Sequence, residues 1–154
     1  MKETGFEIMM MVERLHRIFF DILKYEIDKI EVKDITGIQL LILYSIGKNK
    51  HLTHTELRTR GYYLGSNVSY NLKHMISNGY IEQIPSEHDR RIIPLTLSTK
   101  GRELFKQFED IFENQINRVG GGQLIDFEPF NRTLKFLEEF GKLLFDKKKM
   151  MHSE

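Results

Sequence analysis

Residues 66–74 concentrate polar and mostly uncharged side chains. Those that can donate or accept hydrogen bonds are Ser66, Asn67, Ser69, Tyr70, Asn71, Lys73 and His74. An ordinary solvated helix face is laced with Glu and Lys pairs instead. Side chains of the observed kind hydrogen-bond to the edges of bases and hold phosphates. The alternative interpretation is a polar surface helix of an unrelated small domain.

A short basic loop follows at residues 85–91, with the sequence Pro-Ser-Glu-His-Asp-Arg-Arg. Its residues favour turns, and Arg90 and Arg91 at its end suit contacts with a phosphate backbone or a narrow minor groove. We place His88 with these arginines. Asp89 is expected to pair with an arginine and shape the loop, because phosphates repel a bare carboxylate.

Helix signals place the polar residues on the second of two consecutive helices. Thr53 and Glu56 have the spacing of a capping box, and Gly61 is expected to end that first helix near Arg60. The second helix is expected to begin near Ser66 and to stop at Gly79. It has an apolar stripe at helical spacing, formed by Val68, Leu72, Met75 and Ile76.

Two short strands are expected on either side of the basic loop, at residues 80–84 and 93–97. Apolar residues alternate with Pro94 and Thr96 in the second strand, and Pro94 limits that strand to an edge or irregular position. Residues 48–52 are expected to add a short third strand. Two helices followed by a hairpin with a charged tip predict a winged helix-turn-helix.

These residues resemble the MarR family of bacterial transcriptional regulators. The resemblance rests on Gly79-Tyr80-Ile81-Glu82, on Asp89-Arg90-Arg91, and on Leu95-Thr96-Leu97-Ser98 followed by Gly101. It implies a winged-helix dimer that binds pseudo-palindromic DNA. Many members carry an arginine where Tyr70 stands here, so we expect a different recognised sequence and transfer no operator from the family.

The flanking segments predict helices with more apolar surface than a small domain needs. A first helix is expected at residues 6–30, with apolar residues on more than one face. A nearly continuous apolar helix is expected between Thr36 and Gly47, opened by a capping box of Thr36 and Gln39. A long helix follows Ser98 and Thr99, and a last helix accepts Pro129 in its first turn and precedes a frayed basic run at residues 147–149. The surplus apolar surface predicts dimerisation through both ends of the chain. The alternative for the first helix is central packing within its own monomer.

Charge and composition agree with this prediction. The 154 residues carry a net charge of +1, yet residues 48–102 contain nine Lys or Arg against four Asp or Glu, which leaves the remainder negative. The chain has no cysteine, so disulfides and thiolate metal sites are excluded. It shows no signal peptide, membrane-spanning stretch or catalytic motif, and we expect a cytoplasmic protein that is not an enzyme and needs no cofactor.

Two further kinds of site bear on regulation, a pocket for a small ligand and a metal site. The family resemblance implies that a small aromatic ligand could bind between the dimerisation helices and the DNA-binding lobe, where His16, Phe20, Tyr44, Tyr62 and Tyr63 would line the pocket. The alternative is that these rings are core and hinge packing. His51, His54 and Glu56 could begin a zinc site, but His54 and Glu56 lie two residues apart at a helix start, which points them in different directions, and Glu56 already has a capping role. No metal is therefore expected.

The sequence as a whole predicts a mainly α fold with a small β-hairpin wing. Residues 35–101 would form the winged helix-turn-helix DNA-binding lobe, and residues 1–34 and 102–154 the dimerisation helices. The expected function is transcriptional regulation, with repression preferred, by a bacterial homodimer on a pseudo-palindromic double-stranded DNA operator. The alternatives are a winged-helix module that binds another protein and a metal-responsive regulator.

Overall fold

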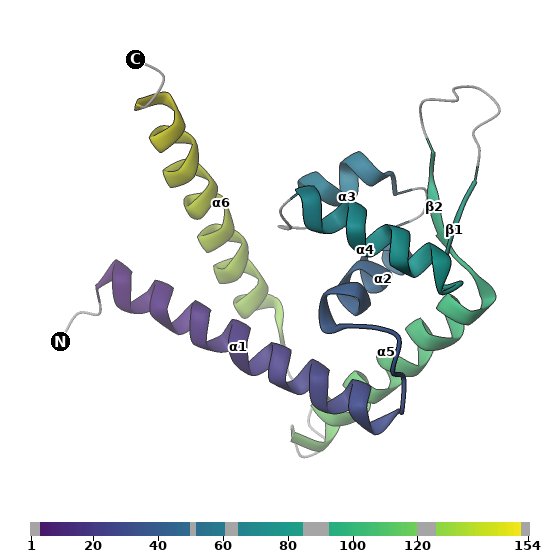
Figure 1. Ribbon diagram of the computed structural model, residues 1–154. Helices are drawn as coiled ribbons and strands as arrows, with labels where there is room; N and C mark the ends of the chain where they lie inside the picture. Colours follow the sequence, from purple (N-terminus) through teal and green to yellow (C-terminus); the bar gives the residue numbers. More distant parts are fainter. Residues whose placement is uncertain (1–3, 50–51, 61–64, 85–92, 120–125, 152–154) are drawn as a thin grey trace. The chain divides into compact units, whose positions relative to one another are not determined.

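A computed structural model describes residues 4–49, 52–60, 65–84, 93–119 and 126–151 of the chain (Figure 1). Contacts divide the chain into two units, Met1–Glu109 and Asp110–Glu154. The predicted fold class is confirmed: the described elements are helices and one two-stranded antiparallel hairpin. The predicted functional division into lobe and dimerisation helices stays a prediction.

Helix α1 (Gly5–Lys29) opens the first unit and buries only its C-terminal part. Thr4 caps it, because its side chain and that of Glu7 form a capping box that the sequence analysis did not identify. Leu23, Glu26 and Ile27 are buried. The rest of the helix exposes large apolar side chains, which include Phe6, Ile8, Met9, Met10, Met11, Leu15, Ile18, Phe19 and Ile22. The expected surplus of apolar surface is therefore present.

Helix α2 (Gly37–Lys48) is the buried scaffold of this unit. The predicted capping box is confirmed: the Gln39 amide N–H donates to Thr36 Oγ1 and the Thr36 N–H donates to Gln39 Oε1. Ile42 and Leu43 are fully enclosed. The helix contacts α1, α4 and β2, so the elements of the helix-turn-helix and the hairpin rest on it.

Helices α3 (His54–Arg60) and α4 (Gly65–Ser77) lie side by side, and α4 contacts α2 (Figure 1). The predicted capping box of Thr53 and Glu56 is confirmed by reciprocal hydrogen bonds of 2.9 and 3.2 Å. Leu57 of α3 is buried, and the predicted apolar stripe of α4 is buried at Val68, Leu72 and Met75. Together the two helices form the expected helix-turn-helix pair.

The hairpin strands are shorter than predicted. β1 (Ile81–Gln83) pairs with β2 (Leu95–Leu97), with Ile81 opposite Leu97. The predicted third strand at residues 48–52 includes residues 50 and 51, which lie outside the described residues; next to it, Thr53 forms a single bridge with Pro94. Proline has no N–H for a longer ladder, although its carbonyl still accepts from the Ile84 N–H at 3.0 Å.

The last two helices are α5 (Thr99–Val119) and α6 (Glu128–Met151). Ser98 caps α5, because its Oγ accepts the Gly101 N–H at 3.0 Å. Pro129 occupies the first turn of α6, as predicted, but α6 continues through residues 147–149 to Met151, so the basic run belongs to the helix and is not a frayed tail. Exposed apolar side chains of α6 include Phe130, Leu134, Phe136 and Phe140. In the described part of the chain, no helix has the length and apolar character needed to cross a membrane.

Candidate nucleic-acid interface

The polar residues of α4 form one exposed face. Asn67, Ser69, Tyr70, Lys73 and His74 are all exposed, and we call these five residues the reading face. At 100° per residue they occupy the side of the helix opposite the buried stripe. Only Lys73 carries a permanent charge, so this face offers directional hydrogen bonds more than net charge.

Asn71 was predicted to join this face, and the structure places it elsewhere. Its side chain is only 9% exposed. Its Nδ2 donates to the Asn67 carbonyl oxygen at 2.7 Å, within the same helix. The helical angle explains the difference, because position 71 lies on the same side as Met75, which is four residues further along α4. Asn71 therefore stabilises α4 from its buried edge.

Two contacts order side chains within the reading face. His54 of α3 lies 3.0 Å from Ser69, measured from the ring Nε2 to Oγ. The ring centroids of Tyr70 and His74 are 4.6 Å apart, one helical turn from each other. Tyr70 is nevertheless 63% exposed, so the stacked pair projects from the helix. Neither contact is predicted by a pattern in the sequence.

Several predicted site residues lie outside the described residues. These are Tyr62, Tyr63, His88, Asp89, Arg90 and Arg91, together with the side chain of Ser66. Their assigned roles stay predictions.

The C-terminal end of α4 is closed by a Schellman motif. Gly79 has φ of +75°, the Tyr80 N–H donates to the Met75 carbonyl at 2.9 Å, and the Gly79 N–H donates to the Ile76 carbonyl at 3.0 Å. This confirms the prediction that α4 stops at Gly79. The left-handed backbone there favours glycine over any residue with a Cβ.

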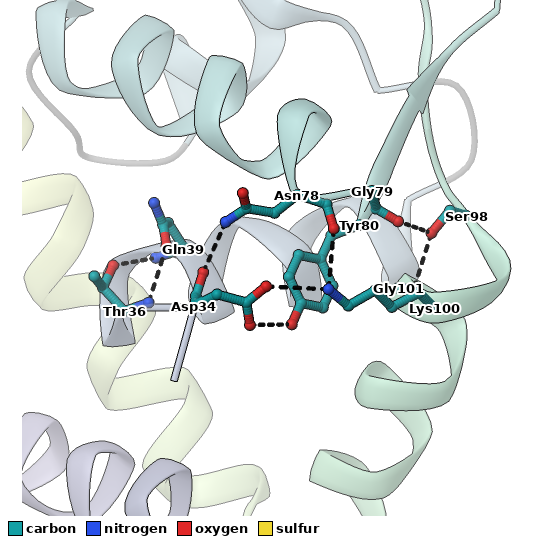
Figure 2. Close-up of polar contacts among 9 residues, drawn as sticks. All are labelled: Asp34, Thr36, Gln39, Asn78, Gly79, Tyr80, Ser98, Lys100 and Gly101. Carbon is teal, nitrogen blue, oxygen red and sulfur yellow. Dashed lines mark hydrogen bonds and ion pairs between the residues drawn. The ribbon is translucent and has the colours of Figure 1, made fainter. Parts of the chain in front are cut away.

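Four residues from distant parts of the sequence meet at this end of α4, and we call them the Asp34 cluster: Asp34, Asn78, Tyr80 and Lys100 (Figure 2). The Asp34 carboxylate accepts from the Tyr80 hydroxyl at 2.7 Å and from Lys100 Nζ at 3.1 Å. Lys100 Nζ also donates to the Asn78 carbonyl at 3.0 Å. Asn78 in turn donates from its side chain to the Asp34 carbonyl at 3.0 Å.

The electrostatics of this cluster follow from these bonds. The hydrogen bond from the Tyr80 hydroxyl lowers the pKa of Asp34. Partial burial raises this pKa, and Lys100 lowers it further, so the net shift is downward. Burial, followed by the hydrogen bond to Asp34, raises the pKa of Tyr80. Lys100 Nζ lies 3.9 Å from the centroid of the Tyr80 ring, so the ammonium contacts both a carboxylate and an aromatic face. A cation at the C-terminal end of α4 also complements the helix dipole.

A second set of contacts joins the same turn to the start of α5. Ser98 Oγ accepts from the Gly101 N–H and donates to the Gly79 carbonyl at 2.5 Å (Figure 2). The Ser98 N–H donates to the Tyr80 carbonyl at 3.0 Å. Gly101 faces this carbonyl so closely that a Cβ at position 101 would lie 2.1 Å from the oxygen. The exit from α4 is therefore packed directly against the first turn of α5.

The predicted ligand-pocket residues with described positions lie in two ring pairs. His16 and Phe20 of α1 have centroids 4.8 Å apart, and Tyr44 of α2 lies 5.5 Å from Phe105 of α5. A cavity of about 310 Å³ lies elsewhere, at the base of the hairpin, and its lining includes Ile46, Leu95 and Arg102. Of the predicted residues that the structure describes, neither His16, Phe20 nor Tyr44 lines this cavity. The ligand pocket stays a prediction.

Among the described residues, no group of three or more His, Asp or Glu side chains could hold a metal ion. His54 instead contacts Ser69, and Glu56 caps α3. His51 lies outside the described residues.

The arrangement of α2, α3, α4 and the β1–β2 hairpin defines a winged helix-turn-helix protein, with α4 in the position of the recognition helix. The family model described as "MarR family" matches residues 33–92. Over these residues the chain is similar to the MarR family.

Similar proteins agree with this assignment. The exopolysaccharide II synthesis transcriptional activator ExpG of Rhizobium meliloti is 42% identical over 101 residues, which are 66% of this chain and 52% of that protein. The chain thus spans about half the length of this curated relative. Streptococcus pneumoniae FabT, solved in complex with DNA, is 25% identical with a TM-score of 0.65, and the match covers 90% of this chain and 98% of FabT. The regulator BldR of Sulfolobus solfataricus has the same fold at 16% identity, with a TM-score of 0.69 over 87% of this chain and 94% of BldR.

Proposed function

We propose that this protein is a transcriptional regulator that binds double-stranded DNA in a sequence-specific manner. The observation that carries the proposal is the reading face, which is exposed, rich in hydrogen-bonding groups and nearly uncharged, on the recognition helix of a winged helix-turn-helix. The concentration of positive charge in residues 48–102 supports it. So does the likeness to FabT, whose structure was solved with DNA.

Individual roles follow from side-chain chemistry. Asn67 and Tyr70 would contact base edges in the major groove, where an amide can form paired hydrogen bonds and an aromatic ring can meet a thymine methyl group. Lys73 would contact phosphate, and His74 supports the Tyr70 ring. His88, Arg90 and Arg91 would serve the wing, with Asp89 shaping the loop. No catalytic role is proposed.

We further propose that the protein acts as a homodimer. The N-terminal part of α1 and, separately, α6 expose apolar side chains that a monomer would leave in water. A two-fold dimer would present two recognition helices about one DNA turn apart, roughly 34 Å, to a pseudo-palindrome. A mass in solution equal to that of the 18.3 kDa monomer at micromolar concentration would contradict this proposal.

Repression, release by a small aromatic ligand and a cytoplasmic location are the remaining parts of the proposal. The name of the relative ExpG describes an activator, so a reporter assay with the selected operator measures the direction of regulation. Thermal melts against a panel of aromatic acids and phenols test the ligand. If no compound stabilises the protein and none releases it from DNA, the predicted pocket at His16, Phe20 and Tyr44 is left without support.

The test of DNA binding is an affinity measurement on random-sequence and selected duplexes at two salt concentrations. Binding should weaken steeply with salt because bound phosphates release counterions. Lys73→Ala should lower affinity, whereas Lys106→Ala, which removes an exposed lysine of α5, should not. A protein-binding winged helix, the competing function, would show neither sequence enrichment nor this salt dependence.

A further inference from the structure

We propose that Asp34 is a positioning residue for DNA recognition, which fixes the C-terminal end of α4 against α5 and against the segment that enters α2. The inference rests on the proposed DNA-binding function. It concerns a residue that lies outside the reading face and 33 or more positions before it in the sequence.

Asp34 is held at a defined place in the connection between α1 and α2. The next residue, Ile35, is 6% exposed, and the capping box of α2 begins at Thr36. The Asp34 backbone is therefore anchored on both its buried neighbour and the start of α2. Its carboxylate is half-exposed and points toward Tyr80 and Lys100 (Figure 2).

The cluster contacts α4 only at its end. Asn78 follows the last residue of α4, and its side chain and its carbonyl are bonded to Asp34 and to Lys100 respectively. Tyr80 supplies the N–H that completes the Schellman motif, and its hydroxyl is bonded to Asp34. A substitution at Asp34 therefore affects the turn that follows the last residue of α4.

The reading face begins one turn from this point. The Asn78 N–H donates to the His74 carbonyl oxygen at 2.8 Å, and the ring of His74 contacts the ring of Tyr70. A helix held rigidly at its end presents these side chains to base edges in one orientation. Base-specific hydrogen bonds need that orientation, whereas phosphate contacts tolerate a shift. Loss of the Asp34 carboxylate should therefore reduce discrimination between sequences more than it reduces binding to any DNA.

The change in net charge alone predicts tighter binding, with no loss of discrimination between sequences. Replacing Asp34 with asparagine removes a negative charge from a DNA-binding protein, which should tighten binding to every duplex. The same charge change is available at Glu109, whose carboxylate pairs with Lys48 and also joins α5 to α2. Glu109→Gln is thus a matched control that removes one carboxylate from a second ion pair, away from the Asp34 cluster.

The experiment compares the affinity of wild type, Asp34→Asn and Glu109→Gln for a selected operator and for a random duplex, at a temperature where circular dichroism shows each protein folded. We expect Asp34→Asn to lose about fivefold in the ratio of specific to non-specific affinity. Glu109→Gln should keep the wild-type ratio. Tyr80→Phe removes only the hydroxyl bonded to Asp34, keeps the buried ring, and should lower the ratio in the same direction.

A second readout does not need DNA. Amide hydrogen exchange at Gly79 and Tyr80 should quicken in Asp34→Asn and stay unchanged in Glu109→Gln, because only the first variant loosens the end of α4. If Asp34→Asn keeps the wild-type ratio and wild-type exchange, the inference is overturned while the proposed function stands. If wild type itself prefers no duplex sequence, both fail together. Should Asp34→Asn not fold, Tyr80→Phe decides the question by the same two measurements.

Discussion

Replacing Gly101 with alanine would place a methyl group against the backbone at the exit from α4. The new Cβ would lie 2.1 Å from the Tyr80 carbonyl oxygen, 3.1 Å from the carbonyl carbon and 3.4 Å from the Leu97 Cβ. Real Cβ atoms do not approach an oxygen so closely, and the nearest atom belongs to backbone that cannot rotate away. The start of α5 must therefore separate from the turn that follows α4.

The expected cost combines three contributions. Forced separation of packed groups destabilises by about 1–3 kcal/mol. The hydrogen bond from the Ser98 N–H to the Tyr80 carbonyl is strained or lost, which adds about 1 kcal/mol. Alanine is better than glycine inside a helix by about 1 kcal/mol, and this offsets part of the cost. The net loss in free energy of unfolding should be roughly 2 kcal/mol, which lowers the melting temperature by about 4–8 °C in a protein of this size.

Thermal and urea unfolding, followed by circular dichroism at one fixed protein concentration, measure this loss. Gly141→Ala is the matched control, because Gly141 also lies inside a helix and, among the described residues beyond its own stretch of helix, no atom would lie within 4 Å of the new Cβ. That variant should gain up to about 1 kcal/mol from helix propensity. If Gly101→Ala were as stable as Gly141→Ala, the close packing of the α4 exit against α5 would be refuted.

Three further outcomes are expected. The pKa of Asp34 is lowered because the Tyr80 hydroxyl donates to its carboxylate. The stabilisation from this carboxylate is therefore fully present above the unfolded pKa of about 3.9, and it is lost as pH falls through the folded pKa. Asp34→Asn should therefore cost about 1 kcal/mol at pH 7, a modest value because the group is half-exposed, and the difference from wild type in urea unfolding should narrow below pH 4. Lys73→Ala should weaken binding to all duplexes and reduce the slope of log affinity against log salt by about 1 in salt titrations, whereas an unchanged slope would remove Lys73 from the phosphate contacts. Arg90→Ala should weaken binding across sequences in the same assay, and affinity equal to wild type would show that the wing was misassigned.

Local signals in the sequence predicted much of the fold. The capping boxes of α2 and α3 were found because both partners lie three residues apart, and the buried stripe of α4 was found from its helical spacing. The same signal was present at Thr4 and Glu7 and could have located the start of α1. Strand lengths were overestimated, because alternation of side chains does not reveal where backbone pairing ends.

The Asp34 cluster could not be predicted in this way. Asp34 is separated by 44, 46 and 66 positions from Asn78, Tyr80 and Lys100, and nothing in one sequence pairs such residues. Asn71 shows a different limit: residue type suggested the reading face, while its helical angle put it on the buried side. The angular position of each residue around the axis of α4 would have distinguished Asn71 from the residues of the reading face.

The central claim, that the exposed face of α4 reads DNA sequence, is tested most directly by selecting bound duplexes from a random pool with wild type and with Asn67→Ala. Wild type should enrich an inverted repeat with half-site centres about 10 bp apart, and Asn67→Ala should relax or change the preference at defined positions in each half-site. Enrichment of the same sequence, with the same strength at every position, by both proteins would contradict a role for this face in reading DNA.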